Sequence, residues 1–178
     1  MTTTVLTWWS TADIAHATRV FKKIVQHVGA IVFACAVTTA FAADPPGLIT
    51  VQSNNSVTDT IQRFEEAVKA SGWMVFARLD HTAAAEKYQQ KLLPRTVIVY
   101  GNPALGTANM VKVPTLAIDI PPKALVWQDD QGKVWLSYNS PAYLNETVYA
   151  RHDVPPSPAE GIAAYTRLLA DWADKATK

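Results

Sequence analysis

Two histidines with charged neighbours are the clearest candidates for chemistry in this chain after its first 42 residues. His81 follows Asp80 directly, and His152 follows Arg151. Two histidines and a carboxylate can hold a metal ion or serve as a general base. The sequence contains none of the patterns H-x-H, H-x-x-x-H or H-E-x-x-H, which bring two imidazole rings to one ion. We therefore predict structural histidines and assign neither a catalytic residue nor a metal ligand.

Other catalytic patterns are also missing. No serine stands in G-x-S-x-G, and no ordered Ser/His/Asp set is visible, so hydrolase chemistry has no support. Asp129 and Asp130 form a carboxylate pair, but they open a Gly-ending turn between two β-type runs. Aspartate is common there because its side chain bonds to the backbone of the turn. We interpret this pair as part of a hairpin.

The run Gly101–Thr107 (GNPALGT) follows a predicted buried strand and opens a predicted helix. Its glycines match the phosphate loop G-x-x-x-x-G-K-[ST], but the lysine is missing and Pro103 removes a backbone donor. A nucleotide site is therefore not predicted. A weak anion site at Asn102 stays open beside the simpler interpretation, a turn that sets the angle between strand and helix.

Aromatic residues are more numerous than a small core requires, and Trp and Tyr concentrate in pockets and dimer faces. Arg95, after Pro94 and beside a predicted buried strand, is either a ligand clamp or an edge charge. Core packing remains the simplest role for each aromatic residue taken singly. If the chain binds a ligand, we expect the site among six residues: Asp80, His81, Arg95, Asn102, Trp127 and His152.

Composition narrows the class of protein. The 178 residues suit one domain, 49% of them are hydrophobic and 17% are charged, below the ~25% of an average globular chain. The formal net charge is +1, and it becomes −1 when residues 1–42, with three basic residues and one acidic residue, are removed. Such a balance gives no basic field for phosphate backbones, so nucleic-acid binding is not predicted.

The N-terminal segment has the features of a secretory signal peptide. Three basic residues precede the uncharged run 24–42, and Ala40 and Ala42 place small side chains at −3 and −1 of a cut before Ala43. We predict cleavage there, with a long n-region, a linker over 43–47 and a periplasmic or secreted domain over 48–178. Export would remove the only cysteine, Cys35, and with it thiol chemistry.

Two alternatives to cleavage stay open. The run 24–42 is long enough to cross a bilayer, so an uncleaved segment would anchor the domain to the membrane. His27, Gly29 and two threonines dilute its hydrophobicity, which favours cleavage. Lipidation at Cys35 is disfavoured because Phe33 is too large for the usual cleavage box.

Helix and strand patterns are clear in the remaining chain. Ser56-Val-Thr-Asp59 is a capping box, Val57, Ile61, Phe64 and Val68 recur at helical spacing, and Gly72 ends the helix. Residues 73–79 form a predicted strand with Trp73, Val75, Ala77 and Leu79 on one side. Residues 82–92 are predicted helical, 97–100 a buried strand, and a short helix runs from Pro103 to about Val111.

The second half contains a hairpin and a last helix. Strands over 123–128 and 133–138 flank the turn 129–132. Ser157-Pro-Ala-Glu160 has the capping-box form, followed by an apolar stripe through Ile162, Tyr165, Leu169 and Trp172. Strict β–α alternation fails at the hairpin, so we predict an α+β fold: an antiparallel or mixed sheet with helices packed on one face.

These blocks together resemble one protein family. Over residues 56–152 the chain is similar to the DUF302 domain, a bacterial and archaeal family without an established activity. The resemblance implies a β-α-β(4)-α architecture, similar to the TATA-binding-protein-like fold, and a homodimer. Residues 145–150 depart from the family pattern by delaying His152, which puts any family role for that histidine in doubt. The matching blocks are 72–73, 75–81, 93–96, 101–103, Met110, 114–115, 119–121, 123–127, 132–138 and 141–144.

The sequence leaves three functions open. The first is an exported, non-enzymatic homodimer that holds a small ligand in an aromatic-lined cleft. The second is a metal- or histidine-dependent enzyme that uses Asp80, His81 and His152. The third is a structural protein that acts through its dimer or a partner. No cofactor is identified, and we favour the binding module because aromatic residues are plentiful and no catalytic set is visible.

Overall fold

The computed structural model describes residues 45–178; the predicted signal peptide and its cleavage site before Ala43 lie outside the described residues. Every described element belongs to one compact unit. In chain order the strands and longer helices are β1 (Leu48–Ser53), α2 (Val57–Ala70), β2 (Met74–Asp80), α3 (His81–Glu86), β3 (Arg95–Gly101), α4 (Pro103–Lys112), β4 (Lys123–Gln128), β5 (Val134–Asn139) and α6 (Ala159–Thr177). Short helical turns lie between them: η1 (Pro114–Ile118), α5 (Pro141–Tyr143), the π-helix η2 (Leu144–Tyr149) and η3 (Ala150–His152).

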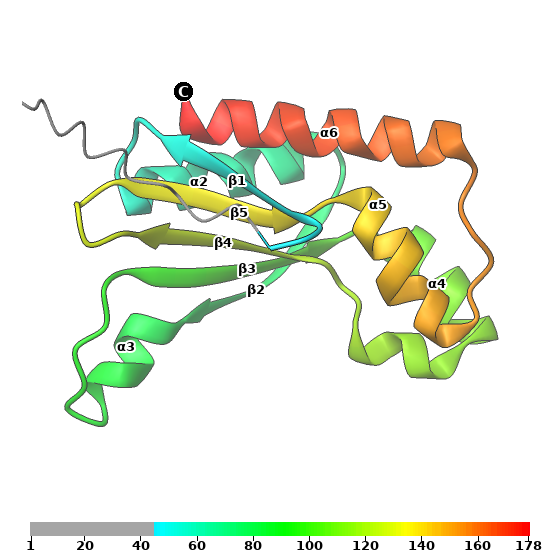
Figure 1. The fold of residues 1–178 in the computed structure, drawn as a ribbon, viewed down its shortest axis with the longest axis horizontal. Coiled ribbons are helices and arrows are strands. Elements are labelled where there is room, and N and C mark those ends of the chain that lie inside the picture. The colour runs from blue at the N-terminus through cyan, green and yellow to red at the C-terminus, as the bar shows by residue number, and fades with distance from the viewer. Residues whose placement is uncertain (1–44) are drawn as a thin grey trace, which may run out of the picture. The chain divides into compact units, whose positions relative to one another are not determined.

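The five strands form one sheet in the order β1-β5-β4-β3-β2, and every neighbouring pair is antiparallel. The long helices α2 and α6 pack side by side on the same face (Figure 1). This confirms the α+β prediction and its β-α-β(4)-α order, with α3, α4 and the short turns as additions. The sheet is purely antiparallel, so the mixed alternative does not apply.

The capping box at Ser56 starts α2 as the sequence predicts. The Ser56 hydroxyl accepts a hydrogen bond from the Asp59 backbone N–H at 3.1 Å and donates one to the Asp59 carboxylate at 2.7 Å. The first bond satisfies a backbone N–H that a helix start leaves free, and the second joins the two side chains. The helix ends before Gly72, whose φ of +75° lies in the left-handed region that glycine tolerates. Its apolar stripe is buried, with Phe64 and Val68 fully enclosed.

Trp172 of α6 packs against several aromatic side chains of the core. Its indole is fully buried and meets the Phe64 and Tyr100 rings edge-on, with centroids 6.3 Å and 5.7 Å away. Its Nε1–H donates to the Ser71 hydroxyl at 2.8 Å, so the end of α2 is tied to α6. Edge-to-face contacts of this kind add to the stability gained from area burial alone. The predicted stripe of the last helix is confirmed.

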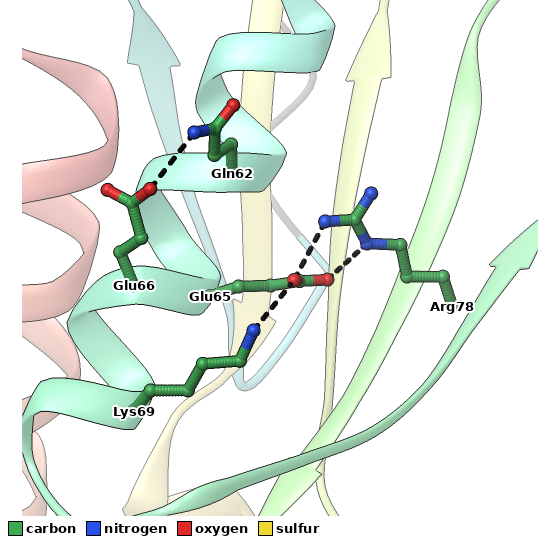
Figure 2. A network of polar contacts seen from close by, with 5 residues as sticks. All are labelled: Gln62, Glu65, Glu66, Lys69 and Arg78. Atoms are coloured by element: carbon green, nitrogen blue, oxygen red, sulfur yellow. Dashed lines mark hydrogen bonds and ion pairs between the residues drawn. The ribbon is translucent and has the colours of Figure 1, made fainter.

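A salt-bridge network joins α2 to the edge strand β2 (Figure 2). The Arg78 guanidinium donates twice to the Glu65 carboxylate, Nη2 to Oε2 at 2.7 Å and Nε to Oε1, and Lys69 Nζ lies 3.6 Å from Oε2. The side chain of Glu65 is 7% exposed and that of Arg78 52%. The hydrogen bonds from Arg78 lower the pKa of Glu65, so the carboxylate stays charged despite its burial.

The predicted facing of β2 is wrong because the strand contains a bulge. Val75 pairs with Tyr100 and Ala77 with Val99, so Phe76 is an extra residue between two adjacent partners. A bulge moves all later side chains to the other face of the sheet. Val75 therefore packs against the core, whereas Ala77 and Leu79 lie on the face away from α2 and α6.

Two predicted helix boundaries are also wrong. The helix predicted over residues 82–92 ends at Glu86, because none of its side chains is buried and Gln89 turns with a positive φ of 56°. The capping box predicted at Ser157 does not form, and α6 begins at Ala159 without a side-chain cap. The Ser157 backbone N–H instead donates to the Asn145 side chain at 2.7 Å. A tertiary hydrogen bond to Asn145 therefore anchors the start of α6 in place of a local side-chain cap.

Candidate ligand cavity

A cavity of about 730 Å³ opens at the end of the sheet where β3 finishes and β4 begins. The helices α4 and α5 lie at this end, whereas α3 lies at the opposite end (Figure 1). The walls of the cavity come from five segments that are distant in sequence. This is typical of sites built at the ends of secondary-structure elements. These segments lie within residues 73–76, 101–110, 116–122, 141–149 and 157–168.

The wall formed by α4 depends on the turn that the sequence singles out. Asn102 caps α4, since its Oδ1 accepts from the Ala104 N–H at 3.0 Å, and Pro103 occupies the first helical position. A Cβ on Gly101 would lie 3.2 Å from the Phe76 ring and 3.3 Å from Pro121, so glycine lets the strand end approach both residues. The turn therefore sets strand-to-helix geometry and places Asn102 in the cavity lining.

Two stacked aromatic rings form another part of the lining, which we call the aromatic wall. The rings of Trp73 and Tyr165 are stacked, with centroids 5.4 Å apart and planes 15° from parallel, and both line the cavity. Trp172 supports Trp73 from behind in an edge-on contact at 5.2 Å. Because the supporting ring is fully buried, the wall is preorganised.

Tyrosine hydroxyls supply the polar groups at the inner end of this wall. Tyr165 Oη is buried and has no hydrogen bond of acceptable geometry among the described residues, although it interacts electrostatically with the Tyr100 hydroxyl. Burial raises the pKa of Tyr165, and it raises the pKa of Tyr149 in the same way. Both hydroxyls therefore stay protonated near neutral pH and keep a proton to donate.

Asn145 joins the π-helix η2 to the start of α6. The residue is 8% exposed, its Oδ1 accepts from the Ser157 N–H at 2.7 Å, and it lines the cavity beside Tyr149. The amide nitrogen Nδ2 has no partner among residues 45–178, so it remains free to donate. π-helical turns concentrate at functional sites because they redirect side chains out of the regular helical face.

The predicted site residues do not gather in one place. Four of them lie at the end of the sheet away from the cavity. Asp80 caps α3 through the Ala83 N–H at 3.0 Å, and His81 is the first residue of α3. Arg95 lies opposite Trp127 across β3 and β4, and its Nη1 donates to the Leu93 carbonyl at 3.0 Å. Of the six predicted residues, only Asn102 lines the cavity.

Trp127 lies on the sheet face opposite α2 and α6. It stacks on Trp135 with ring centroids 6.0 Å apart, and its Nε1–H donates to the Ser137 hydroxyl at 3.0 Å. These contacts account for its conformation without a ligand. The turn predicted at Asp129 also forms, because its carboxylate accepts from the Gln131 and Lys133 N–H groups at 2.9 and 2.8 Å.

His152 of η3 contacts two residues at η1, Thr115 and Asp119, and we call this set of contacts the clamp. Its Nε2 lies 2.6 Å from Asp119 Oδ2 and its Nδ1 3.0 Å from the Thr115 hydroxyl. Arg151 Nε also reaches Asp119 Oδ2 at 3.3 Å. The hydrogen bond from His152 and the charge of Arg151 lower the pKa of Asp119. This clamp ties together two segments that line the cavity, at Leu116 and Tyr149.

The described residues contain no cluster of three or more His, Cys, Asp or Glu side chains that could hold a metal ion. His81 and His152 also lie on different elements, α3 and η3, which have separate polar partners. Residues 45–178 likewise include no helix long and apolar enough to cross a membrane.

Sequence reasoning missed most of the cavity. Tyr165 is predicted as a core residue of the last helix, and only its hydroxyl distinguishes it from the neighbouring apolar side chains. Asn145 and Tyr149 lie in the segment that departs from the expected family pattern. That departure was the one available indication, since a π-helix inserts a residue without any marker in composition.

The described residues form a small α+β domain, with a five-stranded antiparallel sheet and an apolar cavity at one end. A family model described as domain of unknown function DUF302 matches residues 49–171. The chain belongs to the DUF302 family. A solved structure described as an uncharacterized conserved protein DUF302 from Bacillus stearothermophilus has the same fold, with a TM-score of 0.60 at 21% identity. The match covers 74% of this chain and 99% of that one.

Curated relatives extend beyond this domain. The chain is 45% identical over 98 residues to a fluoride-specific ion channel FluC 1 of Brucella suis, and also to FluC 2 of Brucella melitensis. The match covers 55% of this chain but only 39% and 36% of those proteins. Each match covers 98 residues, and residues 1–44 can supply at most 44 of them. More than half of each match therefore lies among residues 45–178.

Proposed function

We propose that this protein is an exported, non-enzymatic binding module that holds a small ligand in the cavity beside α4. The observation that carries the proposal is the cavity of about 730 Å³, within the ~300–1,000 Å³ of drug-sized ligand sites. Its lining is mostly apolar, with a few convergent polar groups at Asn102, Asn145 and Tyr165. This balance of apolar walls and isolated polar groups is typical of small-molecule sites.

A binding role fits this cavity better than catalysis does. Among the described residues, the lining contains no histidine, cysteine, carboxylate or lysine. Its tyrosine hydroxyls have raised pKa values, so they stay protonated near neutral pH and do not supply the phenolate that a base or nucleophile needs. The Thr115–His152–Asp119 chain could move a proton, but none of these three residues lines this cavity.

Gly106 offers a way to fill the cavity selectively. A Cβ on this α4 residue would lie at ordinary contact distance from Ile120 Cδ1 (3.7 Å) and Met110 Cε (3.9 Å), and all three residues line the cavity. Gly106→Ala should be tolerated, and its better helix propensity should add up to about 1 kcal/mol to the free energy of unfolding. Gly106→Leu should fill space that a ligand needs.

The test is a thermal-shift screen of the purified protein with a panel of neutral and charged small molecules. We expect at least one compound to raise the Tm of the wild type and of Gly106→Ala but not of Gly106→Leu. Compounds that stabilise the three proteins equally would place binding elsewhere. No stabilisation of the wild type by any compound would contradict the proposal.

We also propose that the domain works as a homodimer. Antiparallel sheets usually present a polar face to water. Here the face away from α2 and α6 carries Leu79, Val97, Val99, Leu125, Trp127 and Trp135. A second copy of the same face would cover this apolar surface. A dimer is part of two of the three functions that the sequence leaves open, and it is compatible with the ligand cavity.

The channel relatives suggest a second role. The chain matches two fifths or less of each protein, so we propose that the shared part is a DUF302 domain attached to a channel, and that the present domain also serves ion transport. Sodium fluoride in the thermal-shift panel tests this role. Stabilisation by fluoride but not by chloride at equal ionic strength would support it, and an equal response to both salts would contradict it.

Export through the N-terminal segment is part of the proposal. The basic flank, the uncharged run and the small residues at 40 and 42 support cleavage before Ala43, and an uncleaved segment would leave a membrane-anchored form. The intact mass of protein recovered from the periplasm distinguishes the two. A mass that starts at Ala43 agrees with cleavage, and a full-length mass in the membrane fraction contradicts it.

A further inference from the structure

We infer that the cavity selects uncharged ligands with a flat apolar body and a hydrogen-bond acceptor, and that the acceptor lies at the Tyr165 hydroxyl. This inference rests on the proposed binding function and specifies its ligand. It depends on three features of the lining: its charge, its hydroxyl groups and its aromatic wall.

The lining carries no charge. Among the described residues that form it there is no Asp, Glu, Lys, Arg or His. The charged groups nearby have partners outside the lining side chains: Lys123 Nζ donates to the Pro121 carbonyl at 3.4 Å, and Asp119 is paired with His152 and Arg151. An ionised ligand would lose hydration on entry and find no counter-charge, and that cost is large in an apolar site. Neutral molecules do not incur this desolvation cost.

The cavity lining includes hydrogen-bond donors without well-formed partners. Tyr165 Oη is buried and has only a poorly formed contact with the Tyr100 hydroxyl, and a buried polar group without a good hydrogen bond is costly. A ligand carbonyl or ether oxygen that enters between the two tyrosine hydroxyls would remove that cost by accepting from Tyr165. Asn145 Nδ2, also on the lining, is a second donor, because its Oδ1 is occupied by the Ser157 N–H.

The aromatic wall favours a flat ligand. Trp73 and Tyr165 already stack on each other, and Phe76, which is 46% exposed, lines the mouth beside them. Flat rings bury much area at low entropic cost against such a surface. An aromatic or conjugated body with one acceptor oxygen therefore matches the wall and the donors together.

Two dyes with nearly the same body test the charge argument. N-phenyl-1-naphthylamine is neutral, and 8-anilino-1-naphthalenesulfonate adds one sulfonate to the same rings. In fluorescence titrations of the purified protein, we expect the neutral dye to bind at least about tenfold more tightly. Gly106→Leu should abolish binding of the neutral dye, whereas Gly106→Ala should keep it, which separates the cavity from the apolar sheet face.

Two naphthalenes of similar size, only one of which is a ketone, test the donor argument. 2-Acetylnaphthalene has an acceptor oxygen and 2-ethylnaphthalene does not. Competition against the neutral dye should show that Tyr165→Phe weakens the acetyl compound about fivefold and leaves the ethyl compound unchanged. Tyr88→Phe is the control, since Tyr88 is 80% exposed and lies outside the lining.

The outcomes separate this inference from the proposed function. If neither dye binds, or if Gly106→Leu changes neither dye, the cavity is not a ligand site and the proposed function fails. If the sulfonate dye binds in the cavity as tightly as the neutral one, the function stands and the selection for uncharged ligands is overturned. An equal loss of both naphthalenes in Tyr165→Phe would overturn the role of the hydroxyl as donor.

Discussion

Single residues decide which parts of this domain are rigid and which are available to a ligand. Glu65 is buried with its charge because Arg78 and Lys69 satisfy it, so this carboxylate is a structural group. Tyr165 has a buried hydroxyl without such a partner. The two residues look equally unremarkable in the sequence, one on a polar helix position and one on an apolar stripe. Their difference arises from the strands and helices that pack around them.

The Glu65–Arg78 pair predicts an asymmetric response to substitution. Arg78→Met leaves a buried carboxylate with only Lys69, and we expect it to lower the free energy of unfolding by about 2 kcal/mol. Glu65→Gln leaves a guanidinium that is half exposed and can be hydrated, so about 1 kcal/mol is expected. Urea unfolding at pH 7 measures both. The control is Glu66→Gln on the exposed side of the same helix, with a change within about 0.5 kcal/mol.

The pH dependence of the pair follows from the lowered pKa of Glu65. The contribution is fully present above the ordinary carboxyl pKa of 4.5 and is lost as the pH falls through the lower folded-state pKa. The stability difference between wild type and Glu65→Gln should therefore shrink as the pH is lowered below about 4.5. A difference that grows towards acid would show that the pKa is raised instead.

At the scale of elements, the sequence predicts local structure well and tertiary adjustments poorly. The hairpin strands, α2 and the capped α4 follow from turn residues and periodicity, because these determinants lie within the element itself. The bulge at Phe76, the early end of α3 and the π-turn at Asn145 depend on neighbouring segments. The cavity combines five distant segments, so no local pattern could have predicted it beyond Asn102.

The two capping-box patterns give a test at this scale. Ser56 caps α2 through two hydrogen bonds, whereas Ser157 makes no side-chain cap for α6. Ser56→Ala should therefore cost about 1 kcal/mol of unfolding free energy, and Ser157→Ala should cost within about 0.5 kcal/mol. Thermal and urea unfolding measure both. Equal losses would mean that Ser157 caps its helix as the sequence pattern suggests.

For the molecule as a whole, the two faces of the sheet have different roles. One face packs against α2 and α6 and forms the core, and the other presents apolar and aromatic residues that the described helices do not cover. The cavity lies at one end of the sheet, beside α4. The proposed dimer and the proposed ligand site would therefore use separate surfaces of the same domain.

The proposed dimer predicts the effect of a charge on the open sheet face. Leu125→Lys places an ammonium at the centre of that face and should shift the protein from dimer to monomer in light scattering after size exclusion. Its circular dichroism should be unchanged. Ile118→Lys, at an apolar residue 75% exposed on η1, should remain dimeric. A wild type that is monomeric at high micromolar concentration would contradict the dimer.

The central claim is that the cavity beside α4 holds a neutral small molecule, and native mass spectrometry of the exported protein tests it most directly. Protein purified without added ligand should carry a non-covalent small-molecule mass that Gly106→Ala retains and Gly106→Leu loses. Mass analysis of the released compound should identify an uncharged, mostly apolar structure with at least one acceptor oxygen. A bare protein mass together with no response to the neutral dye would contradict the claim.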